Sequence, residues 1–362
     1  MGVALFWFII GHKITFKQRD MIMVDQNQIT KSGVVRFVRN VLIMIFTIQS
    51  IAFVLMSVYF IITNTFPFQQ ALFQALFNTI SLFTNAGFDI APIGSSFSMF
   101  KDSYFLLVLS MGLMFLGAVG FWPLAEFKMW VDAKLKKEQF KFTVFTKLLV
   151  TLHASVWLIS ALGLFLLERQ AYFATSDRID VLFTTMFMSL TTRNAGFSTM
   201  NVGEFSEATS LFLMFLMFLG SSPNSAGGGI RTVTMFVALL SIVSFARGKN
   251  AVVYHQRTIK PETVMKSMVM VIMAFVWVST VILLILIVDN FNYQETAFEV
   301  ISAFGTTGLS LGITSELSNF SRTLIIATMF VGRVSLVSLL LMFKRKGETD
   351  TIRYPEIDMI VG

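Results

Sequence analysis

The chain consists of apolar runs of two lengths, separated by short polar segments. A helix needs about 20 mainly apolar residues to cross a bilayer. Uncharged runs of this length lie at 41–63, 104–125, 148–167, 209–230 and 267–288. Two further apolar stretches follow at 232–246 and 323–343, the second interrupted only by Arg333. The pattern predicts an all-α integral membrane protein.

Three shorter apolar segments lie between these runs, at 70–83, 179–190 and 295–304. At about 1.5 Å per residue, a helix of this length covers roughly half of a bilayer. These segments are too short to cross the membrane and too apolar for ordinary loops. We therefore expect them to form re-entrant helices.

Each short segment is followed by a turn that contains glycine: TNAGF at 84–88, RNAGF at 193–197 and GTTGL at 305–309. Gly87, Gly196 and Gly308 are 109 and 112 residues apart. A constant period indicates a repeated structural unit. The order of span, half-helix, turn, span and basic loop occurs three times.

The start of the chain resembles the end of such a unit. Residues 1–10 are apolar and a basic segment follows them, whereas a signal peptide has its basic residues first and a small-residue cleavage site after the apolar part. One period before Gly87 falls about two dozen residues upstream of Met1. Most of a first repeat is therefore expected to be missing. The predicted division is a remnant at 1–36 followed by repeats at 37–140, 141–260 and 261–362.

Composition and charge agree with this class of protein. Hydrophobic residues make up 55% of the chain, charged residues 14%, and the mean hydropathy is +0.73. Cysteine is absent, which excludes disulfides and thiol chemistry. Of the 28 Lys and Arg residues, 21 lie in the segments 11–40, 126–148, 246–266 and 344–362. By the positive-inside rule these loops and the C-terminus are cytoplasmic, so the net charge of +7 reflects topology and no nucleic acid is expected as a partner.

The glycine turns allow two interpretations. A helix that ends inside a membrane must satisfy its last carbonyl groups, and glycine in a left-handed cap does so. Alternatively, the partial negative charge of the helix end and converging main-chain carbonyls replace the hydration shell of a cation. Three equivalent turns at a constant spacing favour the second interpretation over a capping role alone.

The segments NAGFD, TRNAGFST, SPNSAGGGIRT and SAFGTTGLSLGITSELS resemble the TrkH/KtrB/HKT superfamily of potassium transporters, and within it the KtrB-type membrane subunits of bacterial Ktr potassium uptake systems. The resemblance implies four span–pore-helix–span repeats around one pseudo-fourfold pore axis, here three complete repeats and the end of a first. Its first filter strand has no counterpart in this chain. By position, the potassium filter is expected at Asn85, Ala86, Gly87, Asn194, Ala195, Gly196, Thr306, Thr307 and Gly308.

The segment GSSPNSAGGGIR at 220–231 interrupts an apolar run. Pro223 and three consecutive glycines break a helix, and broken backbone at membrane depth must be shielded by protein or line a cavity. A phosphate-binding loop lacks its Gly-Lys-Ser/Thr ending here, and a plain kink remains an alternative. The resemblance implies an intramembrane gate formed by Gly220, Pro223, Asn224, Ser225, Gly227, Gly228, Gly229 and Arg231, together with Arg333.

Arg333 is a charge inside an apolar run and must face a partner or a water-filled path. The resemblance places it below the filter, although family members usually have Gly-Pro-Leu-Thr where this chain has 335–338 (SLVS). Asp89 follows a turn and either attracts cations at an outer mouth or is an ordinary solvated carboxylate. His153 has no second ligand at metal spacing and is expected either to be packed or to hydrogen-bond between helices.

The predicted function is potassium uptake across the cell membrane by a multi-pass protein that is not an enzyme. The resemblance implies a homodimer, with the tail 353–362 at its contact, and a cytoplasmic ring of nucleotide-binding KtrA-like subunits. K+ is the expected substrate and Na+ a candidate coupling or activating ion; no bound cofactor is expected. The alternative is a truncated, non-conducting subunit. On that ground, we expect these 362 residues expressed alone not to restore growth of potassium-uptake-deficient cells.

Overall fold

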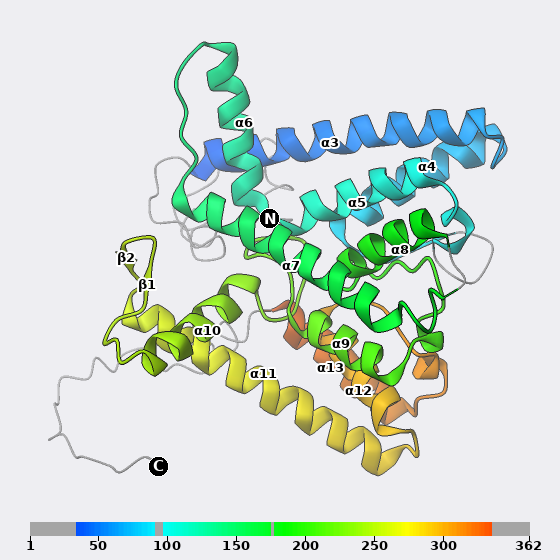
Figure 1. Cartoon of the computed structure of the whole chain (residues 1–362). Helices are drawn as coiled ribbons and strands as arrows, with labels where there is room; N and C mark the ends of the chain where they lie inside the picture. Colours follow the sequence, from blue (N-terminus) through cyan, green and yellow to red (C-terminus); the bar gives the residue numbers. More distant parts are fainter. Residues whose placement is uncertain (1–33, 91–96, 175–176, 335–362) are drawn as a thin grey trace, which may run out of the picture.

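The computed structural model describes residues 34–90, 97–174 and 177–334, which are mostly helical (Figure 1). The helices are α3 (Val34–Ile62), α4 (Phe68–Thr84), α5 (Tyr104–Ala118), α6 (Phe121–Leu135), α7 (Val144–Glu168), α8 (Arg178–Thr191), α9 (Glu207–Phe218), α10 (Thr232–Ala246), α11 (Pro261–Val288), α12 (Tyr293–Gly305) and α13 (Asn319–Arg333). Short 3-10 turns lie at Ser98–Phe100, Val202–Glu204 and Ile313–Ser315. Strands β1 (Val253–Tyr254) and β2 (Arg257–Thr258) form an antiparallel hairpin in which Val253 pairs with Thr258.

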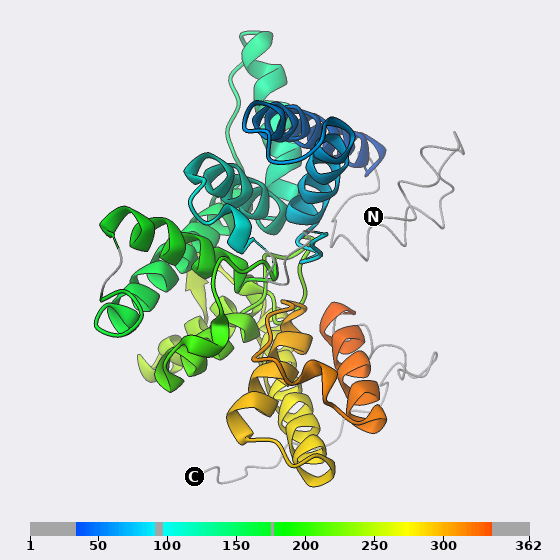
Figure 2. The ribbon, with the colours of Figure 1, turned by 90° about the vertical axis from the view of Figure 1, so that its right-hand side faces the viewer.

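The described residues form three groups of helices with the same order, named here after their first helix. In the α3, α7 and α11 units a long helix is followed by a short helix that packs against it, then by a returning helix. Contacts of α5 with α8 and of α9 with α12 join neighbouring units. Figure 2 shows the three units arranged around a central region in which their connecting segments meet.

The first helix of each unit is long and apolar enough to cross a membrane, at Phe37–Ile62, Val144–Glu168 and Pro261–Val288. These helices expose large apolar side chains, among them Phe46, Leu158 and Phe275, which are 56%, 54% and 66% exposed. A helix that is apolar on all sides is suited to lipid or to a large core. The outward apolar faces therefore fit a protein embedded in a bilayer.

The short helices lie where the sequence predicts half-helices. The expected segments 70–83, 179–190 and 295–304 correspond to α4, α8 and α12, each within two residues at either end. A side-chain cap from Asp177 begins α8, and a capping box of Asn292 and Glu295 begins α12. These three helices of 17, 14 and 13 residues end at the glycine turns.

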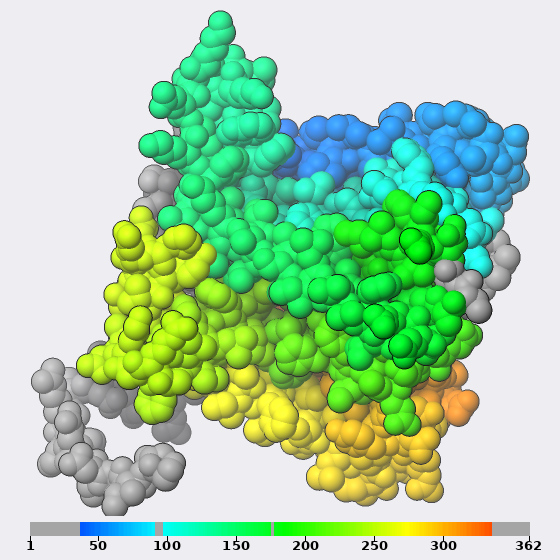
Figure 3. Space-filling view, viewed as in Figure 1, coloured from blue at the N-terminus to red at the C-terminus, as the bar shows by residue number. Residues whose placement is uncertain are grey.

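The apolar run predicted as a span at 104–125 is not one continuous helix. Helix α5 ends at Ala118 and α6 starts at Phe121, with a bend of 104° between them. Gly120 has φ +102°, and a methyl group there would lie 2.7 Å from the Pro223 carbonyl oxygen. The bend therefore makes room for the segment 220–231. The predicted basic loop at 126–148 is in part the helix α6, which projects from the body of the molecule (Figures 1 and 3).

Helices also end inside two other apolar runs, in one case just before the break predicted at 220–231, and in the other just before residues 335–343, which lie outside the described residues. Within 209–230, helix α9 ends at Phe218. Within 323–343, helix α13 ends at Arg333, where Val334 turns to an extended conformation (φ −85°, ψ 115°). Arg333 is therefore the last residue of α13.

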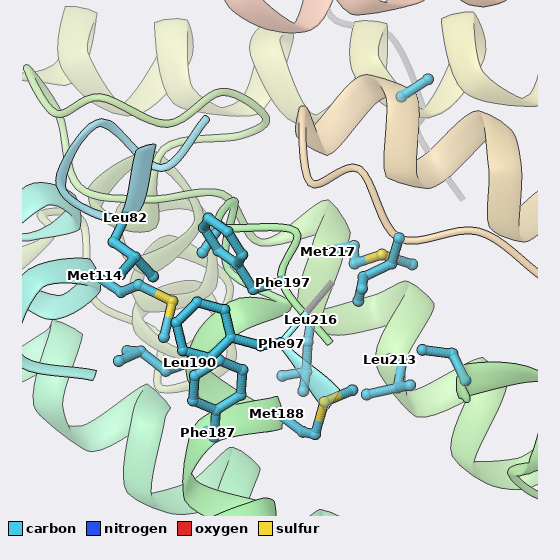
Figure 4. Close-up of a cluster of buried hydrophobic side chains, with 14 of the residues drawn as sticks. Leu82, Phe97, Met114, Phe187, Met188, Leu190, Phe197, Leu213, Leu216 and Met217 are labelled. Atoms are coloured by element: carbon cyan, nitrogen blue, oxygen red, sulfur yellow. The ribbon is translucent and has the colours of Figure 1, made fainter. Parts of the chain in front are cut away.

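A buried cluster joins the α3 and α7 units next to the α8 turn (Figure 4). Phe97 lies at its centre, with ring centroids 5.6 Å from Phe187 and 5.4 Å from Phe197. The Phe97 amide donates to the Ser198 carbonyl at 3.0 Å. Since interiors pack densely, this cluster fixes the position of the turn that follows α8.

Candidate functional site

The turns after α4, α8 and α12 share one backbone pattern. Positive φ angles occur at Asn85 (48°) and Gly87 (71°), at Asn194 (93°) and Gly196 (75°), and at Thr306 (52°) and Gly308 (90°). The residue between each pair does not have a positive φ. Three segments of different sequence therefore adopt the same alternating conformation. The sequence pattern predicts only the spacing of the glycines in these segments.

Each turn also caps the helix that precedes it. The amide of Ala86 donates to the Ser81 carbonyl at 2.9 Å, and that of Thr307 donates to the Ser302 carbonyl at 2.9 Å. The amide of Ala195 bonds to the Thr191 carbonyl at the same distance. These bonds satisfy helix-end carbonyls. The turns therefore cap the preceding helices, as the first interpretation predicts. These bonds use carbonyl groups of the helices and not those of the turns themselves.

The three turns meet at one place. A methyl group on Gly196 would lie 2.1 Å from the Thr307 carbonyl oxygen and 3.3 Å from the Gly87 Cα. One on Gly87 would lie 2.9 Å from the Ala195 carbonyl oxygen. Since real Cβ atoms essentially never approach other atoms closer than 3.0 Å, side chains are excluded here. The glycines allow main-chain carbonyls from three units to approach one another.

The segment 220–231 packs directly against two of these turns. Its ends are held together by a parallel bridge between Leu219 and Ile230. A methyl group on Gly228 would lie 2.5 Å from Thr306 Oγ1, and one on Gly227 would lie 2.7 Å from Asn194 Oδ1. The side-chain amide of Asn194 donates to the Gly228 carbonyl at 3.3 Å. The segment is therefore a loop folded beside the turns and not a simple kink between two helices.

Main-chain hydrogen bonds attach this loop to the α3 unit. Ser222 donates to the Ala118 carbonyl at 3.2 Å, and Phe121 donates to the Asn224 carbonyl at 2.9 Å. Both contacts are made at the bend between α5 and α6. The bend that sequence analysis missed is thus one of the elements that hold the loop.

The α11 unit holds the loop from another side. Gly229 donates to the Gly332 carbonyl at 3.1 Å. Arg333 donates from Nη1 to the Ala226 carbonyl, and Arg231 donates from Nη1 to the Gly227 carbonyl. The structure therefore brings the two predicted gate arginines to one loop, and both bind its main chain.

One residue of this site is absent from the predicted set. Arg193 falls in a segment expected to be polar and connecting, yet its side chain is only 1% exposed. It donates to the His153 carbonyl at 3.0 Å, the Gly220 carbonyl at 3.4 Å and Thr232 Oγ1 at 3.1 Å. A charge between an apolar half-helix and the NAGF turn is the signal by which the sequence identifies it.

Other predicted residues lie around this centre. The ring of His153 is fully buried in α7 and packs on Phe115, with centroids 4.6 Å apart, which confirms the packing prediction. Asp89 is partly exposed just beyond the α4 turn. Within the described ranges, no group of His, Cys, Asp and Glu residues has the geometry of a metal site. The predictions for 1–33, 335–338 and 353–362 concern residues outside those that the structure describes.

The fold and the meeting turns define a helical membrane protein whose central site is made of main-chain groups. Residues 5–353 match the TrkH family, described as cation transport proteins. The chain belongs to this family of transport proteins, which is not a family of enzymes.

Several characterised relatives are similar over most of their length. Ktr system potassium uptake protein D of Bacillus subtilis (strain 168) is 39% identical over 356 residues, covering 98% of this chain and 78% of the relative. Ktr system potassium uptake protein B of the same organism is 31% identical over 362 residues, covering 99% and 79%. Potassium/sodium uptake protein NtpJ of Enterococcus hirae is 29% identical over 369 residues, covering 99% and 79%.

The solved structures agree on the fold. The crystal structure of the potassium transporter TrkH from Vibrio parahaemolyticus matches with a TM-score of 0.68 and covers 90% of this chain and 68% of that chain. The sequence identity is 15%, so this likeness concerns the arrangement of helices alone.

Proposed function

We propose that the protein takes up potassium ions across the cell membrane, through a selectivity filter made of the turns after α4, α8 and α12. The observation that carries the proposal is the meeting of three turns with one alternating backbone pattern, at glycines that exclude side chains. Carbonyl oxygens in such an arrangement replace the hydration shell of K+ without any acidic residue. The relatives named as potassium uptake proteins support K+ as the substrate.

The filter in this proposal consists of main-chain oxygens from the three stretches 85–87, 194–196 and 306–308. The hydroxyl groups of the preceding helices support the strands, since Ser81 Oγ donates to the Phe88 carbonyl at 2.7 Å and Thr191 Oγ1 to the Phe197 carbonyl at 2.6 Å. Such bonds orient the strand from behind, which leaves the carbonyls of the turn for the ion. The assignment of repeats to 37–140, 141–260 and 261–362 stays a prediction.

The loop at 220–231 is the gate in this proposal. Its glycines lie against Asn194 and Thr306 at the base of the turns. At this position the loop blocks the path by which a potassium ion leaves the filter. Arg231 and Arg333 hold its carbonyls and place positive charge beside that path. Movement of this loop, rather than of whole helices, opens the path.

The partners follow from the relatives. Two of them are named as components of Ktr systems, which supports a membrane subunit that works with partner subunits. In this proposal the partner is a cytoplasmic KtrA-like ring, and the membrane subunit is a homodimer. The basic loops and the C-terminus face the cytoplasm in this arrangement. The name of the NtpJ relative includes sodium, which makes Na+ the candidate second ion.

The test is potassium uptake at low external K+ in cells that lack their own uptake systems, with the Gly196→Ala variant as the filter probe. Gly248 has φ +66° in open space, and Gly196 has φ +75° in a crowded site, so Gly248→Ala is the control for backbone strain. With a KtrA-like ring co-expressed, we expect uptake by the parent and the control, and loss of uptake or of K+ preference in Gly196→Ala. The expectation that the chain expressed alone does not restore growth is tested in the same cells without the ring. A folded, membrane-inserted parent that carries no potassium, alone or with a KtrA-like ring, would support the non-conducting alternative.

A further inference from the structure

Arg193 connects the α8 turn with both ends of the 220–231 loop. One nitrogen, Nη2, donates to the Gly220 carbonyl at the start of the loop and to Thr232 Oγ1 just after its end. Thr232 Oγ1 itself donates to the Gly220 carbonyl at 3.1 Å, and the Thr232 amide donates to the Ser221 carbonyl at 3.2 Å. The two ends of the loop and the guanidinium group thus form one hydrogen-bonded cluster.

The other nitrogen attaches the cluster to the scaffold. Nη1 donates to the carbonyl of His153, at the middle of the long helix α7. Among the described residues, all hydrogen-bond acceptors of Arg193 are neutral, and its Nε has no partner. A buried charge is tolerated when hydrogen bonds compensate it. Breaking this cluster therefore leaves the buried guanidinium group without its hydrogen-bond acceptors, which costs free energy. This cost stabilises the arrangement against small displacements.

Arg193 is also the residue directly before Asn194, whose side chain bonds the loop at Gly228. Two consecutive residues of the turn thus hold the loop at different points, Arg193 at its ends and Asn194 at Gly228. We propose that Arg193 is a positioning residue which holds the loop 220–231 in its closed position and couples that position to potassium binding at the turn. This inference rests on the proposed function.

The coupling follows because the turn carbonyls and the Arg193 side chain belong to one continuous stretch of backbone. Potassium at the turn draws the carbonyls of 194–196 toward itself, and the backbone that carries them also carries the Arg193 side chain. Coupling between two sites is reciprocal. Release of the loop from Arg193 therefore weakens the effect of potassium on the turn. Lysine keeps the charge but has a single donor centre in place of a planar fork. Lysine cannot hydrogen-bond to the His153 carbonyl and to the loop ends at the same time. The Arg193→Lys variant therefore keeps the positive charge and loses the hydrogen-bond geometry.

The test uses the absence of cysteine from the chain. A single Ala226→Cys substitution places one thiol on the partly buried loop, and its rate of reaction with a small thiol reagent reports how often the loop opens. The rate is measured on the full protein in detergent, in KCl and in NaCl of equal concentration. Arg193→Gln, Arg193→Lys and Thr232→Val are added to this background, with Arg322→Gln as the matched control, because Arg322 is exposed and donates to a carbonyl of Ser315.

We expect Arg193→Gln to raise the thiol reaction rate by about tenfold or more, since hydrogen bonds to charged groups are worth enough for such a change. Thr232→Val raises the rate less, and Arg322→Gln leaves it unchanged. Potassium slows the reaction about fivefold or more in the Ala226→Cys parent, and this protection disappears in Arg193→Gln and Arg193→Lys.

Equal rates in the parent, Arg193→Gln and Thr232→Val overturn the inference. If Arg193→Gln does not yield folded protein, the Thr232→Val variant decides, because valine has the shape of threonine and lacks only the hydroxyl group. Failure of the proposed function gives a different result: the parent shows no protection by potassium, while Arg193→Gln still accelerates the reaction. Retained potassium protection in a folded Arg193→Gln variant shows that the coupling does not pass through this residue.

Discussion

Gly196 and Thr307 come into direct contact although 111 residues separate them, and a methyl group on Gly196 would lie 2.1 Å from the Thr307 carbonyl oxygen. At Gly308 the nearest atom to such a methyl group is the Gly196 Cα, 3.8 Å away. The three turn glycines therefore differ in how tightly the other strands enclose them. This difference allows crowding to be separated from backbone strain.

Alanine at Gly196 is expected to disturb potassium selectivity more than alanine at Gly308. Both substitutions place an L residue at positive φ, which costs about 1 kcal/mol or more, but only the first also displaces the Thr307 carbonyl. We expect K+ over Na+ preference to fall about tenfold or more for Gly196→Ala, the change that about 1.4 kcal/mol produces. Competitive uptake of the two ions measures it. Equal effects at both positions, matched by Gly248→Ala, would show that strain alone matters.

Shortening the loop by deletion of 224–229 is expected to raise the flux of potassium. The deletion removes the Ala226 and Gly227 carbonyls that Arg333 and Arg231 bind and the glycines that lie against the turns. Initial rates of uptake, normalised to the amount of protein in the membrane, give the answer. A deletion in the β1–β2 hairpin at 255–256 is the control. Unchanged flux in a folded variant would contradict a gating role of the loop.

Arg333→Gln is expected to act in the same direction as the deletion, but more weakly. It removes one bond to the loop, and a hydrogen bond from a charged group contributes about 1.5–3 kcal/mol. Arg333→Lys retains the charge and should retain part of the effect on flux. Arg322→Gln changes an exposed arginine of α13 that donates to the Ser315 carbonyl, away from the loop, and should behave like the parent. Lower flux in Arg333→Gln than in the parent would be evidence against the arginine as a restraint on the gate.

Glu168 provides a stability test that is independent of the filter. Its buried carboxylate accepts bonds from the Ser206 amide at 3.0 Å and the Ser206 hydroxyl at 2.9 Å, which fixes the start of α9 against the end of α7. Glu168→Ala leaves buried donors unpaired, so we expect a loss of about 3 kcal/mol of unfolding free energy. Thermal unfolding in detergent measures the loss. Glu207→Ala, at an exposed site on the first turn of α9, should change stability far less.

The variant Glu168→Ala also separates stability from ion selectivity. The carboxylate contacts neither the turns nor the loop in the described structure. The fraction of protein that folds should therefore keep the K+ preference of the parent. A changed preference would mean that the α7–α9 connection contributes to the filter.

The lengths of apolar runs were sufficient to locate α4, α8 and α12, because length and polarity are local properties of a helix in a membrane. The same reasoning failed at 104–125 for a tertiary reason. The bend at Gly120 accommodates Pro223, which lies about a hundred residues further along the chain and leaves no trace in the hydropathy of 104–125. Glycine at 117 and 120 was compatible with either a straight or a bent helix.

By itself, the sequence determined the helical class, the period of the repeated turns and the break at 220–231, since glycine, proline and run length act locally. The tertiary structure decided that the three turns meet, that 220–231 folds back beside them and that Arg193 lies buried between them. Those features depend on contacts between residues that are far apart in the sequence, and on a charge whose acceptors are two main-chain carbonyls and one hydroxyl group. Main-chain carbonyls are present at every position, so no sequence pattern distinguishes the ones that bind a ligand or an arginine.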